Sequence, residues 1–523
     1  MWRLRARLKE MQNLPRNIGR LIAIARVFAR YDVIAPLIEI GLVPSWLGPA
    51  HWFAGRNRDG LRPGERLSRA ARELGPSFIK MGQALATRAD LVGEEIAADL
   101  AHLQDRLPPV PGADARAMIE SEFGRPLDAL FAAFDDDAVA AASIAQVHFA
   151  VTTEGAPVAV KVLRPGIEKV FARDLGLFAW LADLAERTQP RLRRLKPREV
   201  IATLARSIRF EMDLRLEAAA AAELGQNFAD DPGFRVPRVD WQRTSKRVLT
   251  IERVVGIRID QREALIDAGR DVRAVLVNAA SSFFNQVFRD GFFHADMHPG
   301  NLYVAEDNAI LAVDFGIMGR LDRRTRYFLA DMLLGFLSGN YRRVAEVHFE
   351  AGYVPPDQSL DDFTQACRSI GEPLLGRPLT EISLGRLLAQ LFEITEQFHM
   401  ETQPQLLLLQ KTMLIAEGVG RRLDPTVNMW ELAQPLIEDW MRINRGPEAR
   451  LRQSVETAAR AVTQLPRLIV GLDRVSTDLA EGGLRLHPDS LRELTDALRR
   501  QRSAAELPLW ILLAVLIAAL VLK

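Results

Sequence analysis

The spacing of three polar side chains in residues 291–316 constrains this chain more than any other feature of its sequence. Asp296 precedes Asn301 by five positions, and Asn301 precedes Asp314, the first residue of an Asp-Phe-Gly triplet, by thirteen. Carboxylate and amide oxygens are hard ligands that suit Mg²⁺, and a second carboxylate can orient or deprotonate an attacking hydroxyl. Asp-Phe-Gly alone also suits an ordinary turn, but the apolar run at 310–313 predicts a strand directly before it. The spacing therefore indicates a site for ATP-dependent phosphoryl transfer.

Such a site needs a phosphate-binding lysine on an upstream strand and a carboxylate on a following helix. Lys161 closes a short β-branched run, although that run taken alone would fit an edge strand with a solvated end. The helix predicted to cover 209–217 offers Glu211, Asp213 and Glu217 as partners for the lysine. Helical periodicity leaves the choice among these three carboxylates open.

Six ordered motifs between Lys80 and Gly316 resemble the UbiB family of atypical kinase-like proteins. These bacterial proteins are related to the mitochondrial ADCK proteins and are tied to ubiquinone biosynthesis. The resemblance implies an α+β, protein-kinase-like two-lobed fold that is mainly α-helical overall and carries an N-terminal helical extension. The motifs are Lys80-Met-Gly-Gln83, Ala140-Ala-Ala-Ser143 running into Ile-Ala-Gln-Val-His148, Val-Ala-Val-Lys161, Glu211-Met-Asp213, His294-Ala-Asp-Met-His-Pro-Gly-Asn301 and Asp314-Phe-Gly316.

The resemblance implies roles for the residues of the site, with ATP and Mg²⁺ as cofactors. Lys161 pairs with Glu217 on the regulatory helix, and Asp296 is the catalytic-loop acid. Asn301 and Asp314 hold the metal.

The resemblance also implies how the nucleotide binds. Lys161 holds the α- and β-phosphates, and a hinge at 251–254 meets adenine through the backbone of Glu252 and Val254. The loop over the phosphates consists of Ala140, Ala141, Ala142 and Ser143.

The Lys80 motif lies in a helical segment that ordinary kinases lack. By composition alone Lys80 would be an exposed lysine beside a glycine. By the resemblance, Lys80 and Gln83 enter the cleft with a regulatory role, and the acidic Glu211 and Asp213 face them. A lysine in a partly dry cleft needs carboxylate partners, and the extension would block the place where a peptide substrate docks.

Three departures from ordinary protein kinases bear on the substrate. The loop over the phosphates has alanines in place of glycines, and alanine adopts positive φ only at a cost, so the nucleotide geometry should differ. Met297 and His298 stand in the lysine region of the catalytic loop, which removes a fixed cation. After Gly316 the chain enters a predicted helix at 321–330, with no Ala-Pro-Glu and no long activation segment. These departures favour ATP hydrolysis, or action on a small or lipid-like molecule, over phosphorylation of other proteins.

Composition agrees with a body of several domains. A length of 523 residues with 48% hydrophobic residues is ample for a two-lobed core with helical additions. The net charge of +1 argues against nucleic acid as a partner. The single cysteine, Cys367, excludes an internal disulfide and fits a reducing cytoplasm. His294 and His298 are the only close histidine pair, and the kinase-like loop explains them better than zinc does.

The apolar run at 507–522 predicts a transmembrane anchor. Its 16 residues span about 24 Å, which reaches across a bilayer core if Trp510 and Lys523 lie at the interfaces. A buried terminal helix is the alternative. Three arginines within 499–502 precede the run, so the catalytic body is expected on the cytoplasmic side of the cell inner membrane. The basic, amphipathic residues 1–48 are expected to lie on anionic lipid or on the kinase-like body.

These signals predict six segments. They are a basic amphipathic segment at 1–60, the helical extension at 61–135, the small lobe at 136–256, the large lobe at 257–445, a helical tail at 446–503 and the transmembrane anchor at 504–523.

Two classes of function fit the sequence. The first is a membrane-anchored, Mg-ATP-dependent ATPase or atypical kinase that supports or regulates ubiquinone biosynthesis. The second is a nucleotide-gated lipid-binding protein, or a scaffold for the ubiquinone enzymes, without essential turnover. In both, the expected partners are the lipid membrane, ubiquinone precursors or other isoprenoid lipids, and other enzymes of ubiquinone biosynthesis. An intact set of five site residues favours the enzyme: Lys161, Glu217, Asp296, Asn301 and Asp314.

Overall fold

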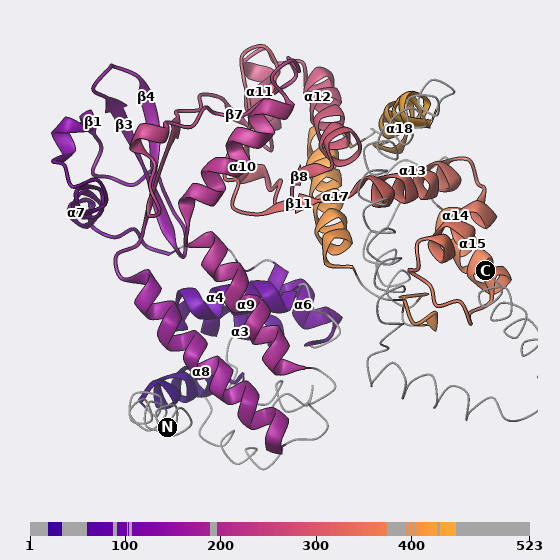
Figure 1. The fold of residues 1–523 in the computed structure, drawn as a ribbon, viewed down its shortest axis with the longest axis horizontal. Coiled ribbons are helices and arrows are strands. Elements are labelled where there is room, and N and C mark those ends of the chain that lie inside the picture. Colours follow the sequence, from indigo (N-terminus) through magenta and orange to yellow (C-terminus); the bar gives the residue numbers. More distant parts are fainter. Residues whose placement is uncertain are drawn as a thin grey trace, which may run out of the picture. The chain divides into compact units, whose positions relative to one another are not determined.

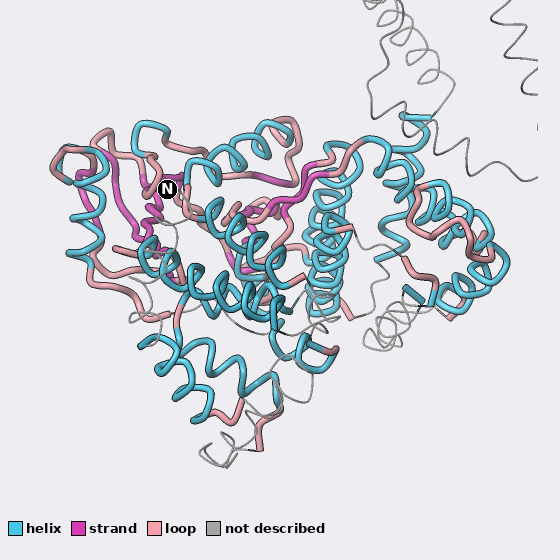
Figure 2. Tube along the Cα trace, turned by 60° about the horizontal axis from the view of Figure 1, so that its bottom comes forward, coloured by secondary structure: helices cyan, strands magenta, loops and turns pink. Residues whose placement is uncertain are grey.

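The computed structural model of the chain describes residues 19–33, 60–86, 92–101, 103, 107–188, 196–373, 394–395, 397–400, 403–425 and 429–445. The chain divides into two compact units, Met1–Trp440 and Met441–Lys523. The elements described below belong to the first unit, apart from the end of helix α18. Helices form most of the described chain, and the strands are short (Figure 2). The fold is α+β and mostly helical, as the sequence predicts.

A layer of N-terminal helices forms the extension (Figure 1). Proline occupies the first position of α3 and α4, where its fixed φ suits a helix start and no amide is lost. Between these two helices Gly75 has a φ of 100°, which separates them with a sharp turn. The helices are α3 (Pro63–Leu74), α4 (Pro76–Ala86) and α6 (Glu94–Ala101).

Residues 19–33, the described part of the basic lead, pack against this layer. Residues 19–30 are helical, and Ile24, Val27 and Val33 are buried in the same cluster as side chains of α3, α4 and α8 (Ile167–Thr188). Arg20 donates to both carboxylate oxygens of Asp174 at 3.1 and 2.9 Å. This part of the lead therefore lies on the protein body.

An antiparallel five-stranded sheet forms the small lobe, in the order β1-β3-β4-β6 with β2 paired to β3. Its strands are β1 (Phe131–Phe134), β2 (Ala140–Ala141), β3 (Ala145–Thr152), β4 (Pro157–Leu163) and β6 (Val248–Glu252). Val158, Val160 and Val162 alternate along β4 and bury one face against Ile119 of α7 (Gly112–Phe123). The sheet thus begins at Phe131, slightly before the boundary predicted at 136.

Three helices follow β4, namely α8 (Ile167–Thr188), α9 (Pro197–Glu211) and α10 (Leu214–Asn227). The prediction of one helix across 209–217 was wrong, because α9 ends at Glu211. The Asp213 side chain caps α10 by accepting from the Arg215 amide. The Leu214 amide donates to the Lys246 carbonyl at 2.9 Å and so leaves the helical ladder.

The large lobe is mainly helical and contains two small sheets. Its helices are α11 (Arg262–Asp267), α12 (Val272–Phe284), the π-helix η5 (Asn285–Asp290), α13 (Arg323–Leu337), α14 (Tyr341–Glu350), α15 (Leu360–Gly371), α17 (Pro404–Leu423) and α18 (Met429–Arg445). One sheet has the order β5-β10-β9-β7 and the other pairs β11 with β8. Their strands are β5 (Phe234–Arg235), β7 (Ile257–Arg258), β8 (Phe292–His294), β9 (Leu302–Val304), β10 (Ile310–Ala312) and β11 (Met318–Arg320).

The strand predicted before Asp-Phe-Gly is present as β10, and the helix predicted from Leu321 begins two residues later as α13, capped by Asp322. The predicted anchor at 504–523 and the tail at 446–503 lie outside the described residues. Within the part of the chain that is described, no helix is both long and apolar enough to cross a bilayer.

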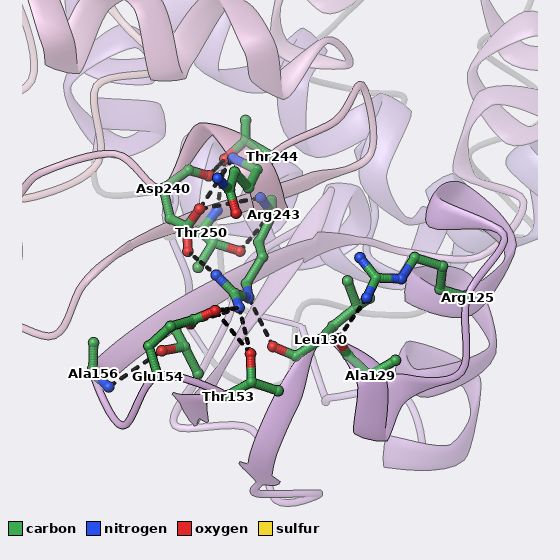
Figure 3. Close-up of polar contacts among 12 residues, drawn as sticks. Arg125, Ala129, Leu130, Thr153, Glu154, Ala156, Asp240, Arg243, Thr244 and Thr250 are labelled. Carbon is green, nitrogen blue, oxygen red and sulfur yellow. Dashed lines mark hydrogen bonds and ion pairs between the residues drawn. The ribbon is translucent and has the colours of Figure 1, made fainter.

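The buried Arg243 side chain ties together three parts of the small lobe (Figure 3). Its guanidinium donates to the Leu130 carbonyl at 2.7 Å, to Asp240 at 2.8 Å, and to Thr153 and Glu154 in the β3–β4 turn at 2.8 Å. A positive charge is stable in this position because each of the three guanidinium nitrogens donates to an oxygen acceptor.

Arg243→Met is therefore expected to lower the free energy of unfolding by about 2 kcal/mol, since it leaves the carbonyl of the buried Leu130 without its donor and removes the bonds to Asp240 and to the β3–β4 turn. Guanidinium unfolding would measure the change. Arg125→Met is the matched control, because the exposed Arg125 donates only to the Ala129 carbonyl in the same region (Figure 3). That control should stay within about 0.5 kcal/mol of the parent. Equal losses in the two variants would contradict the role given to Arg243.

Candidate active site

Lys161 joins the two lobes through a cluster of three charges. Its Nζ lies 2.7 and 2.9 Å from the two carboxylate oxygens of Glu217 and 3.0 Å from Oδ1 of Asp314. The lysine comes from β4, the glutamate from the first turn of α10 and the aspartate from the end of β10. The structure thus brings together the strand lysine, the helix carboxylate and the metal-loop carboxylate that the sequence named.

Burial and mutual charge set the protonation of this cluster. Burial disfavours the cation, but the neighbouring Asp314 and Glu217 carboxylates raise the pKa of Lys161 above its usual value. The positive charge of Lys161 in turn lowers the pKa of Asp314. Burial raises the pKa of Glu217 to about 7, against the attraction of Lys161. Lys161 and Asp314 are therefore a stable ion pair at neutral pH.

The backbone of the Asp-Phe-Gly triplet places the Asp314 carboxylate beside Lys161. Asp314 has a φ of 63°, in the left-handed region that aspartate and asparagine tolerate better than most residues. Phe315 is buried and packs against the His294 ring at 5.6 Å between centroids. A Cβ on Gly316 would lie 3.3 Å from Oδ1 of Asp314, so the absence of a side chain leaves room beside the carboxylate.

The catalytic loop is held by its own backbone and by a buried histidine. The Asp296 amide donates to Nδ1 of His294 at 3.1 Å, so Nε2 carries the proton and donates to the Val313 carbonyl at 3.3 Å. Burial lowers the pKa of His294 and keeps the ring neutral, as this pattern requires. His294 therefore links the catalytic loop to the segment that leads from β10 into Asp314.

Asn301 and His298 close the loop. Nδ2 of Asn301 donates to the Asp296 carbonyl at 3.1 Å, which leaves its amide oxygen as the group that can meet a cation. Nδ1 of His298 accepts from the Gly300 amide at 3.1 Å. His298 is a turn-forming residue here, as the kinase-like interpretation proposed.

Lys411 is a site residue that sequence reasoning missed. Its Nζ lies 2.8 Å from Oδ1 of Asp296, although the two residues are 115 positions apart. Lys411 belongs to α17, far from every motif used in the sequence interpretation. Nothing in local spacing could have assigned it to the catalytic loop.

The alanine loop forms a hairpin with β3. Ala140 pairs with Val147, Ala141 pairs with Gln146, and the Ala142 amide donates to the Ala145 carbonyl at 2.8 Å. None of the positive φ angles of the described chain falls at 140–143, which agrees with the conformational limits of alanine. Ser143 at its tip is buried.

The hinge lies at the end of β6. The Glu252 amide donates to the Arg238 carbonyl at 2.9 Å, and the Arg253 amide donates to the Pro157 carbonyl at 3.1 Å. The Glu252 carbonyl and the backbone of Val254 thus remain the candidate groups for adenine.

The Lys80 motif meets one of its two predicted acidic partners. Nζ of Lys80 lies 2.5 Å from Oε2 of Glu211, and both side chains are largely buried. Asp213 instead caps α10 and pairs with the Arg215 side chain at 2.7 Å. Nε2 of Gln83 donates to the Leu103 carbonyl at 3.5 Å, within the helical extension. The break between α9 and α10 separates the two acids and gives each its own basic partner.

Gln146 and His148, two motif residues without an assigned role, fasten the extension to the sheet. Gln146 accepts from the Val110 amide at 2.8 Å and donates to the Val110 carbonyl at 3.2 Å. Nδ1 of His148 donates to the Asp135 carbonyl at 2.8 Å, so its Nε2 accepts from Gln146. Arg164 adds a link from the Ala142 carbonyl to the Pro108 carbonyl at 2.9 Å each.

The oxygen donors of the site suit Mg²⁺. Asp314 is half exposed, and Asn301 directs its amide nitrogen away, so both can offer oxygen to a cation. Among the described residues there is no cluster of three or more acidic, histidine or cysteine side chains. Mg²⁺ in kinase-like sites does not need such a cluster, since nucleotide phosphates and water supply the other ligands.

Two family models match the chain. The ABC1 atypical kinase-like domain covers residues 102–348, and the UbiB helical domain covers residues 367–428. The first contains Lys161, Glu217, Asp296 and Asp314, and the second contains Lys411.

The curated relatives agree with these models. A probable protein kinase UbiB of Marinobacter nauticus is 46% identical over 445 residues, covering 83% of this chain and 81% of the relative. One from Pseudomonas aeruginosa is 41% identical over 461 residues, covering 86% of each. A solved chain described as the complex structure of Rv3197-erythromycin from Mycobacterium tuberculosis has 24% identity and a TM-score of 0.47, covering 70% of this chain and 93% of that one. The chain belongs to the UbiB family of atypical ABC1 kinase-like proteins.

Proposed function

We propose that the protein is a membrane-anchored, Mg-ATP-dependent ATPase of the kinase-like class that supports or regulates ubiquinone biosynthesis. The observation that carries the proposal is the joint placement of Lys161, Glu217 and Asp314 within hydrogen-bonding distance. Phosphoryl transfer needs such a set to hold phosphates and metal, beside a carboxylate for the nucleophile. Asp296 supplies this carboxylate from the catalytic loop, and Asn301 of the same loop offers an amide oxygen for the metal.

The residues present can hold Mg-ATP. Asp314 and the Asn301 amide oxygen would bind the metal, and Lys161 would meet the α- and β-phosphates. Mg²⁺ would neutralise charge on the phosphates. Asp296 would orient the attacking oxygen and accept its proton.

Features around the site favour a small or lipid-like acceptor, or water, over a peptide. The Lys80–Glu211 pair fixes helix α4 to the end of α9, directly before the helix that carries Glu217. Only β11 and a short turn separate Gly316 from α13, so little chain remains for a peptide platform. On the family resemblance alone, we propose ubiquinone precursors or other isoprenoid lipids as ligands, and other enzymes of ubiquinone biosynthesis as partners.

ATP turnover by the purified full-length protein, with and without anionic vesicles, tests this proposal. We expect turnover that rises with vesicles and is lost in Asp314→Asn. Nucleotide binding without turnover under either condition would instead support a nucleotide-gated scaffold.

Deleting residues 507–523, which lie outside the described residues, tests the membrane part. The truncated protein should become more soluble and keep binding Mg-nucleotide, because the deletion removes apolar surface that we assign to the inner membrane. In this variant we expect any remaining attachment to anionic vesicles to come from the basic residues within 1–48. That attachment should weaken with added salt, since each basic residue near such a surface contributes only about 1 kcal/mol. Ubiquinone output in cells should fall. Aggregation with loss of the thermal transition would show that the run is a core helix.

A further inference from the structure

The catalytic loop has no cation of its own. Between Asp296 and Asn301 the loop carries Met297, His298, a proline and a glycine. Met297 is buried, and Nδ1 of His298 accepts a hydrogen bond from the Gly300 amide. A transferring phosphoryl group gains negative charge on its oxygens, and a fixed positive charge beside the catalytic carboxylate is one way to stabilise it.

Lys411 brings a cation to this place from another part of the chain. Its Nζ is 2.8 Å from Oδ1 of Asp296, and the side chains of Lys411 and Asp296 are 43% and 32% exposed. A lysine ammonium at this distance is a charged hydrogen-bond donor that can hold the carboxylate in one direction.

Helix α17, which carries Lys411, is held in place by contacts near both of its ends. Near its start, Leu406 packs on a cluster that contains Met332 and Tyr353. At its end, the Leu423 carbonyl accepts from Nε of Arg262 at 2.8 Å. The helix also contacts α12 and β11, the strand that pairs with β8 directly before the catalytic loop (Figure 1). Lys411 lies between these attachments.

We propose that Lys411 is a positioning residue for Asp296: its positive charge, which the catalytic loop itself lacks, holds the carboxylate in place. The inference rests on the proposed phosphoryl-transfer function. By this assignment the UbiB helical domain, which spans 367–428, completes the active site of the kinase-like domain. A partly exposed ion pair adds little to stability, so the contribution of Lys411 is expected in turnover.

Lys411→Met and Lys411→Arg in the full-length protein test the assignment, with Mg-ATP as the probe. The methionine variant should lower kcat by about 10- to 100-fold with KM for Mg-ATP within about threefold, because a misplaced carboxylate costs rate rather than ground-state binding. The arginine variant should recover part of that loss. Arg422→Met is the matched control, since Arg422 lies on the same helix and pairs with Asp260 at 3.6 Å. It should leave kcat unchanged.

A double-mutant cycle separates action through Asp296 from any independent effect. In an Asp296→Asn background, Lys411→Met should cost less than about threefold more, since the carboxylate that it positions is already gone. If the fold-loss in kcat of the double variant equals the product of the losses in the two single variants, the assignment is overturned. An unchanged kcat in Lys411→Met alone would overturn it too. A wild-type protein without ATP turnover would defeat the proposed function itself, whereas normal wild-type turnover with an indifferent Lys411→Met would defeat only this inference.

Discussion

Asp314→Asn is expected to lower the affinity of the protein for Mg-ATP by more than about 100-fold. Mutating a residue that only hydrogen-bonds to a metal ligand commonly lowers metal affinity by about 10- to 100-fold, and removing a charged ligand itself should cost more. The change replaces a charged oxygen ligand with a neutral amide, while the side chain keeps nearly the same shape. Asparagine tolerates the left-handed backbone of Asp314, where φ is 63°, so the loop should keep its conformation. Calorimetric titration with ATP in the presence of Mg²⁺ would measure the loss.

Asp307→Asn is the matched control for this variant. The Asp307 side chain is 53% exposed against 51% for Asp314, and both pair with one basic residue in the described structure. The control removes the same charge from the same lobe, at the turn before β10, and should leave Mg-ATP affinity unchanged. A similar loss in both variants would show that net charge, not metal ligation, controls binding.

The residue types of the central cluster could be predicted from sequence, but the lysine's partner could not be found by periodicity. A continuous helix over 209–217 would leave Glu211, Asp213 and Glu217 as competing partners. The capped break at Asp213 assigns Glu211 to Lys80 and Glu217 to Lys161. The resemblance to the UbiB family selected Glu217 correctly because the family carries information about tertiary structure that local spacing lacks.

Residues that act across long stretches of chain were beyond prediction. Lys411 reaches Asp296 only because α17 packs beside the strands that flank the catalytic loop. Gln146 and His148 belong to a recognised motif. Their hydrogen bonds with Val110 and Asp135, however, depend on how the chain on either side of α7 and β1 packs against β3. Each contact follows from packing between distant elements, which no local pattern encodes.

The three lysines of the site share one physical role. Lys80, Lys161 and Lys411 come from the extension, the sheet and α17, and each engages a carboxylate of another element. A carboxylate in a partly dry cleft keeps its charge and direction only when a cation lies against it. The extension therefore meets α9 through the Lys80–Glu211 pair, and α17 meets the catalytic loop through the Lys411–Asp296 pair.

Asp296→Asn is expected to lower ATP turnover by about 10²- to 10⁴-fold, the usual contribution of a general base, while Mg-ATP affinity stays within about threefold. Asparagine keeps the shape of the side chain, and the loop stays in place because its backbone is held by His294 and Asn301. Turnover and binding would be measured on the same preparation, so that the two effects can be separated.

The contrast with Asp314→Asn makes this test decisive for the division of roles. Asp231→Asn is its control, since the Asp231 side chain is 30% exposed against 32% for Asp296 and also pairs with a basic residue, Arg289 at 2.6 Å. Loss of turnover with retained Mg-ATP affinity in Asp296→Asn, and no loss in Asp231→Asn, would separate the group that acts on the nucleophile from the groups that hold the metal. Equal loss of nucleotide affinity in the Asp296 and Asp314 variants would contradict both assignments, because a general base acts on the reacting oxygen and contributes little to ground-state binding.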